Sequence, residues 1–231
     1  MKHWVFAVCL FWLSLAGSAT QRADQVELLK KVDAKYIVAK TVTMAVNKTD
    51  KLSALEQTKS SEGTLQMKKG KLRMELTSSE SDKETGKETS KEQSLVVVDG
   101  KNLWLVSPPV KDAKNSKTQV AKTKLANKKA KSHLLLQILT DGGVFRFFQV
   151  DKSVEQDDMV VYFLKPEKSM QEIQKAQVLV DKTKQVIAQF KYWDAMENET
   201  VYQFTNVEFD KPIKDSVFTY APPKDAQVSE F

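Results

Sequence analysis

Apolar residues recur at helical spacing near the start of the chain, within residues 24–38. Asp24 and Glu27 have the spacing of a capping box at the beginning of this segment. The apolar side chains would share one face of a helix: Val26, Leu29, Val32 and Tyr36. We therefore predict an amphipathic helix over residues 24–38.

From residue 41 onward the apolar period changes to two, which is typical of half-buried strands. The first predicted strands are Thr41–Val46, Gly63–Lys68, Lys71–Thr77, Ser94–Val98 and Asn102–Ser107. Lys69-Gly70 and Asp99-Gly100 separate pairs of these strands, and Asp-Gly is a strong hairpin signal. The later predicted strands are Val144–Val150, Met159–Leu164, Ala176–Asp181, Val186–Asp194 and Thr200–Glu208, with Val217–Tyr220 as a last short one. About ten or eleven sequential strands predict a mainly β (α+β) chain with a large antiparallel sheet curled into a barrel or part-barrel.

A second helix is predicted over residues 132–140, where Ser132 can act as the cap and Asp141-Gly142-Gly143 ends the segment. Its apolar side chains point in nearly all directions: Leu135, Leu136, Ile138 and Leu139. Such a helix is either buried on every face or lies against something apolar that is not protein. His133 is expected on its exposed or capping side.

Two polar tracts interrupt the strand pattern. Residues 77–93 contain no large apolar side chain, and we predict a solvated, mobile excursion with a binding loop as the alternative. Residues 111–131 carry eight lysines and one acid, Asp112. No aromatic residue lies among these lysines, which argues against nucleic acid. We predict a solvated edge strand and loop, with contact to anionic lipid headgroups or an acidic partner as the alternative.

The first nineteen residues have the order of parts of a secretory signal peptide. Lys2 and His3 form a short basic start, residues 4–15 are apolar except for Ser14, and residues 16–19 are small. Cleavage is expected after Ser18 or Ala19, which would leave residues 20–231 as a single exported domain. Export of a chain without a later apolar segment of membrane length favours a periplasmic protein.

Composition then narrows the candidate chemistry. The chain has 231 residues, a net charge of +6, 41% apolar residues, seven glycines, two histidines and one cysteine. His3 and Cys9 both lie in the predicted signal peptide, so few residues remain for a metal site or a cysteine nucleophile. No glycine-rich phosphate loop or nucleophile elbow occurs. We expect no catalytic residue, no metal and no cofactor, and therefore not an enzyme.

Leucine and methionine alternate along two of the predicted strands. The side chains that share one face are Leu65 and Met67 on one strand, and Leu72, Met74 and Leu76 on the next. Flexible, unbranched side chains suit a surface that repacks around a variable apolar guest. The same pattern also fits an ordinary filled core.

Three segments together resemble the LolA family of periplasmic outer-membrane lipoprotein carriers. Residues 97–105, VVDGKNLWL, resemble the family's V-x-D-G-K-x-L-W hairpin. Residues 63–75, GTLQMKKGKLRME, are similar to its G-x-L-x-x-x-R-P-x-x-F-R-W-E stretch, and residues 218–228, FTYAPPKDAQV, to its C-terminal F-x-F-x-P-P-x-x-x-x-V ending. The order of elements fits over essentially the whole chain after the signal peptide.

This resemblance implies an unclosed, eleven-stranded antiparallel β-barrel whose concave apolar face is covered by helices. It implies that the leucines and methionines of residues 65–76 and the helix at residues 132–140 bind the acyl chains of lipoproteins. It further implies a carrier, expected to be a monomer, that receives acylated lipoproteins from an inner-membrane ATP-driven releaser and passes them to an outer-membrane acceptor.

The chain departs from the family pattern at three places. Lys68 or Lys69 stands where the family has the arginine that latches the lid, and lysine lacks the planar donor geometry of arginine. Leu72 and Met74 replace aromatic residues, and residues 77–93 look like an insertion. Two alternatives therefore stay open: a related half-barrel that binds another lipid or glycolipid or senses mislocalised lipoproteins, and a structural or interaction domain without lipid.

Overall fold

The computed structural model describes residues 14–81, 88–109, 116–126, 138–139, 143–170 and 172–230, and it describes the side chains of all of these except 14–23, 79–81 and 88–91. Helix α1 spans Ser14–Val38, and none of the helices in this described part is both long and apolar enough to cross a membrane. The strands are β1 Thr41–Leu52, β2 Gln57–Lys68, β3 Lys71–Ser81, β4 Glu88–Val98, β5 Asn102–Ser107, β6 Gln119–Lys124, β7 Phe148–Gln156, β8 Met159–Pro166, β9 Ile173–Asp181, β10 Val186–Asp194, β11 Glu199–Phe209 and β12 Gln227–Glu230. Short 3-10 turns lie at Ser53–Leu55 (η1), Val144–Arg146 (η3) and Asp215–Phe218 (η4).

All of these strands belong to one sheet in the order β12-β6-β5-β4-β3-β2-β1-β11-β10-β9-β8-β7. Neighbouring strands are antiparallel except for β12, which runs parallel to β6. In the described part of the chain β12 and β7 are the two ends of the sheet and do not pair with each other. The protein is therefore an open half-barrel, as predicted, with twelve strands instead of eleven.

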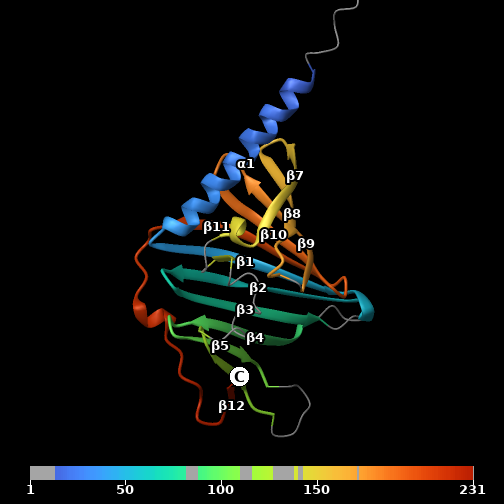
Figure 1. The fold of residues 1–231 in the computed structure, drawn as a ribbon. Helices are drawn as coiled ribbons and strands as arrows, with labels where there is room; N and C mark the ends of the chain where they lie inside the picture. Colours follow the sequence, from blue (N-terminus) through green and yellow to red (C-terminus); the bar gives the residue numbers. More distant parts are fainter. Residues whose placement is uncertain are drawn as a thin grey trace, which may run out of the picture.

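Helix α1 packs along the β7–β11 side of the sheet (Figure 1). Leu29, Val32 and Tyr36 are buried against the sheet, so the predicted apolar face of the helix is confirmed. The helix starts ten residues before Asp24, and Asp24 is therefore an internal residue and not the predicted N-cap. The turns preceding Asp24 continue the same helix, which removes the need for a capping box at this position.

Gly63 of β2 lies in close contact with the backbone of β3. A Cβ atom at this position would lie 1.8 Å from the main-chain oxygen of Glu75 on β3. Glycine is therefore required by the close contact of backbones, which is a common device where a sheet bends sharply. The predicted Asp99-Gly100 hairpin is also confirmed, because the Asp99 carboxylate accepts hydrogen bonds from the main-chain N–H groups of Lys101 and Asn102.

The residues after β11 pass from the middle of the sheet to its β6 edge, where β12 adds to it (Figure 1). On the way, Tyr220 packs edge-on against Trp104 with ring centroids 5.6 Å apart. Trp104 belongs to a small cluster on the face of the sheet opposite α1, together with Val97 and Val120. The C-terminal segment thus covers a second, smaller core.

Three predictions of secondary structure were wrong. Val217–Tyr220 is not a strand, because Asp215–Phe218 forms η4 and inserts Phe218 into the interior. Val144–Val150 begins as the 3-10 turn η3, and β7 starts only at Phe148. In both segments apolar residues are buried from a turn, which local alternation cannot distinguish from a short strand.

The third concerns the polar tract 77–93, which was predicted as a mobile excursion, but β3 continues to Ser81 and β4 starts at Glu88. Their register includes Thr77 opposite Gln93 and Ser79 opposite Lys91. Backbone hydrogen bonds of a hairpin do not require apolar side chains, and Ser and Thr are accepted in exposed strands. The tract is an extension of the β3–β4 hairpin, with residues 82–87 outside the described part.

Candidate functional site

The face of the sheet that packs against α1, called the inner face from here on, carries the predicted leucines and methionines. Strand register places Leu65 opposite Met74 and Met67 opposite Leu72. All five predicted side chains are at most 7% exposed and belong to one apolar cluster: Leu65, Met67, Leu72, Met74 and Leu76. The structure therefore brings together the predicted strand residues of the site, while their binding of lipid stays a prediction.

Helix α1 contributes further side chains to this cluster. Leu29, Val32 and Tyr36 are members of it. The Tyr36 hydroxyl accepts a hydrogen bond of 3.2 Å from the main-chain N–H of Ile187 on β10, and burial raises the pKa of this phenol. The Tyr162 hydroxyl of β8 donates a hydrogen bond of 2.5 Å to the main-chain oxygen of Gln25. These two hydrogen bonds, at Tyr36 and at Gln25, hold the helix against the sheet in addition to its apolar packing.

The predicted helix at residues 132–140 is described only at its end. Ile138 and Leu139 are helical, Ile138 is buried in the inner-face cluster, and Leu139 packs against it. The main-chain N–H of Gly143 donates a hydrogen bond of 3.0 Å to the Ile138 oxygen. Leu135 and Leu136, the other two predicted residues, lie outside the described residues, as do residues 111–115 and 127–131 of the lysine-rich tract. The described part of that tract contains the strand β6, but β12 pairs with it, so the prediction of an edge strand was wrong.

Asp33 connects α1 to the residues that follow this segment. Its carboxylate, 5% exposed as a residue, accepts hydrogen bonds from the main-chain N–H groups of Val144 at 2.9 Å and Phe145 at 3.4 Å. Burial raises the pKa of Asp33, and these two N–H groups oppose the increase only in part. A Cβ atom on Gly143, which has φ +86°, would lie 2.4 Å from the same carboxylate. Sequence reasoning missed this contact because Asp33 is a single acid on an otherwise ordinary helix.

Lys68 and Lys69 were predicted as candidates for a lid latch. The Lys68 Nζ lies 3.0 Å from Asp215 Oδ1 and donates a hydrogen bond of 3.3 Å to the Ile213 oxygen. Lys71 shares Asp215 at 3.2 Å, and the two ammonium groups hold the pKa of that carboxyl below its usual value. Lys69 is exposed in the β2–β3 turn. Among the described residues Lys68 therefore contacts the C-terminal segment, and a latch role stays a prediction.

The inner face has a second half that sequence reasoning missed. β1 continues beyond the predicted Val46, and its inward positions become polar at Lys48 and Asp50. Asp50 Oδ2 lies 2.5 Å from Lys48 Nζ, and Asp50 Oδ1 accepts a 2.9 Å hydrogen bond from the Thr200 hydroxyl. Tyr192 and Tyr202 lie beside them on β10 and β11. In the sequence, Lys48 and Asp50 continue the two-residue spacing of the buried positions of β1. This spacing did not indicate a strand because their side chains are charged.

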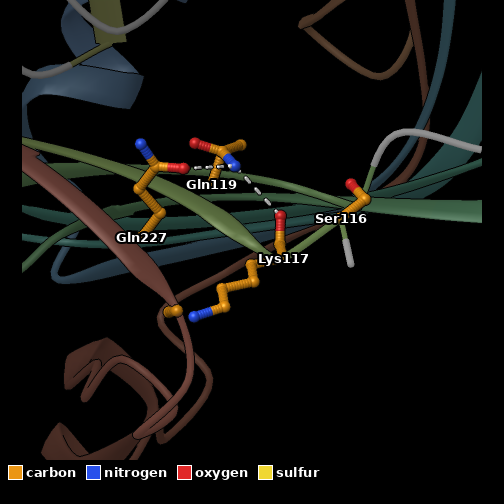
Figure 2. Close-up of a pocket in the computed structure, with 5 residues that line it drawn as sticks. Ser116, Lys117, Gln119 and Gln227 are labelled. Atoms are coloured by element: carbon orange, nitrogen blue, oxygen red, sulfur yellow. Dashed lines mark hydrogen bonds between the residues drawn. The ribbon is translucent and has the colours of Figure 1, made fainter. Parts of the chain in front are cut away.

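Two cavities outside the inner face are polar or mixed. One of about 480 Å³ lies where β6 and β12 meet, and Figure 2 shows Gln119 bonded to the Gln227 side chain and to the main-chain oxygen of Lys117. The other, of about 370 Å³, lies under the C-terminal segment between Arg73 and Tyr220. The first cavity is lined mainly by polar groups, which do not match alkyl chains, whereas the second has apolar residues such as Leu95, Val106 and Tyr220 beside Arg73 and Glu75.

The described residues offer apolar surface rather than reactive groups. No group of three or more histidine, cysteine, aspartate or glutamate side chains lies close enough together within the described ranges to hold a metal ion. What the arrangement supplies is a buried sheet of Leu, Met, Val and aromatic side chains under a helix, inside an unclosed barrel.

Three solved structures are similar over most of both chains. An uncharacterized conserved protein from Thermus thermophilus has 12% identity and a TM-score of 0.48, with 90% of this chain and 99% of that chain covered. A LolA superfamily protein from Nitrosomonas europaea has 11% identity and a TM-score of 0.40, with 84% and 97% covered. The lipoprotein LppX of Mycobacterium tuberculosis has 10% identity and a TM-score of 0.40, with 83% and 96% covered.

A search of curated protein sequences finds no match to this chain. The family model for the outer membrane lipoprotein carrier protein LolA matches residues 38–221, from the end of α1 to the residues before β12. This range contains the five predicted leucines and methionines of β2 and β3 as well as the polar residues beside them. The chain belongs to the LolA family.

Proposed function

We propose that this protein is a periplasmic carrier that buries the acyl chains of lipoproteins on its inner face and moves them from the inner to the outer membrane. The observation that carries the proposal is the Leu- and Met-rich cluster of β2 and β3, which lies on the inner face of a sheet that does not close. Each buried CH₂ group of an acyl chain gains about 0.8 kcal/mol, so a lipoprotein needs such a cover to cross water. Flexible side chains allow the cover to repack around a guest and release it again.

The partners follow from membership of the family. An inner-membrane ATP-driven releaser would load the carrier, and an outer-membrane acceptor would receive the cargo. We further propose a monomer that uses no cofactor and performs no covalent chemistry.

The decisive experiment measures whether the purified protein keeps an acylated lipoprotein, tested in its diacylated and triacylated forms, soluble without detergent. We expect wild-type protein to form a soluble complex and Met67→Glu, which places a charge in the buried cluster, to lose it. Gln66→Glu is the matched control, because Gln66 is the neighbouring residue on the same strand and points to the other face. Circular dichroism establishes that both variants are folded. Failure of wild-type protein to hold the lipoprotein, or equal loss in both folded variants, would refute the proposal.

This proposal and its nearest alternative differ in the molecule that is carried. Lys68 or Lys69 stands where the resemblance implies a latching arginine, and Lys68 is paired with Asp215 of the C-terminal segment. Because lysine lacks the planar donor geometry of that arginine, a related carrier of another lipid or glycolipid is the second candidate. Mass spectrometry of lipids that co-purify with the protein distinguishes the two, because lipoproteins and free lipids differ in mass and in their sensitivity to protease.

Export by a signal peptide cleaved after Ser18 or Ala19 is part of the same proposal. α1 starts at Ser14, and cleavage would therefore shorten the helix without touching its buried residues from Leu29 onward. Intact-mass measurement of the protein from a periplasmic extract should give a chain that starts at Ala19 or Thr20. A full-length chain retained in the cytoplasm would contradict periplasmic transport.

A further inference from the structure

The inner face continues beyond its apolar cluster as a polar surface. Two polar rows follow the apolar cluster along β1, β11 and β10, at the end of β1 that is remote from α1. In the first row Lys48 lies opposite Tyr202, and in the second Asp50 lies opposite Thr200, which in turn lies opposite Tyr192. The preceding inward residue of β1, Val46, is fully buried in the apolar cluster. Acyl chains on the apolar cluster would therefore have their polar ends next to these rows.

These polar side chains are shielded but still accessible. The side chains of Lys48 and Asp50 are 23% and 26% exposed, whereas Thr200 and Tyr202 are 9% and 6% exposed as residues. The Tyr202 ring is thus almost completely buried, and burial raises the pKa of its phenol well above the usual value. A phenol that stays protonated keeps its O–H as a hydrogen-bond donor for a ligand or water.

The charges of the rows balance each other. Lys48 is paired with Asp50, and Lys59 of β2, which lies opposite Asp50, is paired across β3 with Glu92 of β4 at 3.2 Å. The Lys48 Nζ also lies 5.8 Å from the ring centroid of Tyr202, within the range of a cation–π contact. A purely anionic headgroup would bring its charge next to Asp50, and a neutral one would leave the pairs unchanged.

A ligand that carries its own ammonium group close to ester or phosphate oxygens fits these contacts. Its ammonium could replace that of Lys48 on Asp50, above the Tyr202 ring, so that Asp50 keeps a cationic partner. The released Lys48 ammonium and the Tyr202 hydroxyl would then donate hydrogen bonds to ester or phosphate oxygens of the same ligand. Both groups occur together, a few bonds apart, in a diacylglyceryl lipid that carries a primary amine.

We propose that Lys48, Asp50 and Tyr202 form a headgroup site for a primary ammonium attached to a diacylglyceryl unit. The inference rests on the proposed binding of acyl chains to the inner face and names the polar end of that cargo. Two sources share this chemistry: the free amino terminus of a diacylated lipoprotein and the phosphoethanolamine head of a phospholipid. The site would distinguish a free amine from the same lipid with its amine acylated or absent.

The test compares matched lipids by competition with a fluorescent fatty acid bound to the full chain. One pair is a synthetic diacyl lipopeptide with a free amino terminus and the same peptide with its amine acylated by a short acetyl group. The other pair is phosphatidylethanolamine and phosphatidylglycerol of equal chain length. For wild-type protein we expect at least one amine to bind about tenfold more tightly than its counterpart, as one charge-assisted hydrogen bond allows. The pair with the larger ratio identifies the source.

Asp50→Asn should reduce this ratio to near one, because the amide keeps an acceptor for Thr200 but removes the negative charge. Asp151→Asn is the control, since it neutralises the same type of residue in an ion pair with Lys165 between β7 and β8. It should leave the ratio unchanged. Binding of the fatty acid by both variants shows that they are folded.

Equal binding of both members in both pairs, or a ratio that persists in Asp50→Asn, would overturn the headgroup site while the acyl-chain carrier remains. Absence of binding by every lipid, including the fatty acid, would instead refute the carrier function and the headgroup site with it. The two failures are therefore distinguishable in one experiment.

Discussion

The strands β1 and β2 each have two halves with the same backbone pairing and opposite side-chain chemistry. In the apolar half, inward side chains such as Val46 and Leu65 are almost completely buried, as is Leu72 on the adjoining β3. In the polar half, the inward residues of β1 and β2 are Lys48, Asp50, Lys59 and Ser61, and they are half-buried or exposed. The hydrogen-bonded ladder between β1 and β2 runs through both halves without a break.

The difference shows that two requirements determine these strands. Burial of apolar area in the first half supplies free energy of folding, at roughly 25 cal/mol per Å². The polar half of β1 and β2 buries little apolar area and so adds little free energy of folding. Its residues are better explained by the polar side chains that they offer to a ligand. The following predictions test this division between a stabilising half and a presenting half.

The largest effect is expected at Gly63, where the two halves meet. Gly63→Ala places a Cβ atom 1.8 Å from the Glu75 oxygen, and the strands must separate to accept it. We expect a loss of about 4 kcal/mol or more in the free energy of unfolding, measured by urea denaturation. Gly70→Ala is the control, because Gly70 has φ +70° but no atom within 4 Å of the added carbon. Its cost should stay near the ~1 kcal/mol of backbone strain.

Leu72→Ala tests the stabilising half directly. Leu72 is fully buried, and its truncation should destabilise the protein by about 3 kcal/mol through lost packing and a residual cavity. Ser61→Ala on the polar half of β2 is the counterpart, with an expected change within about 0.5 kcal/mol. Comparable losses at the two positions would show that both halves stabilise the fold and would remove the distinction.

The sequence predicted the apolar half almost completely and the polar half not at all. The alternation of Leu65, Met67, Leu72 and Met74 indicates which side chains are buried, because burial selects apolar residues at every second position. Beyond Val46 and before Gly63 nothing in the local sequence selects for burial, so the predicted strands end there. Their continuation depends on pairing with β11 and β2, which is a property of the sheet and not of the segment.

The candidate site shows the same division. Each of its five strand residues was identified from the sequence, since all of them are apolar and have the two-residue spacing of a strand. Asp33, Tyr202 and Thr200 could not be predicted, because each is ordinary in its own segment and becomes significant only through a partner far away in the sequence. Asp33 bonds to Val144, and Thr200 bonds to Asp50.

Acidification should affect two regions in opposite directions. The folded-state pKa of Asp33, under α1, is raised, so its contribution to stability is present below the unfolded pKa and is lost as pH rises through the folded value. Burial of Glu199, in β11 beside the polar half, would raise its pKa, but Lys51 and Lys191 outweigh burial and hold it below the usual value. Its contribution is therefore present above the unfolded pKa and is lost as pH falls through the folded value.

Urea midpoints of Asp33→Asn and Glu199→Gln between about pH 3 and pH 7 check these signs. Relative to wild type, Asp33→Asn should become more favourable as pH rises, and Glu199→Gln should become less favourable. We expect both changes to be smaller than the loss in Leu72→Ala. Parallel pH profiles of the two variants would contradict the assignment of opposite environments.

The smallest effect concerns local opening of β1, which has a strand on each side along its length. Val46 and Thr49 are paired on both sides but lie in different halves. Because fewer apolar contacts hold the polar half, its amides should open at lower free energy. Hydrogen exchange should be about tenfold faster at Thr49 than at Val46 after correction for intrinsic rates. Equal protection would mean that the polar half is as firmly held as the apolar half, and the headgroup site would then have to bind its ligand without local opening of the sheet.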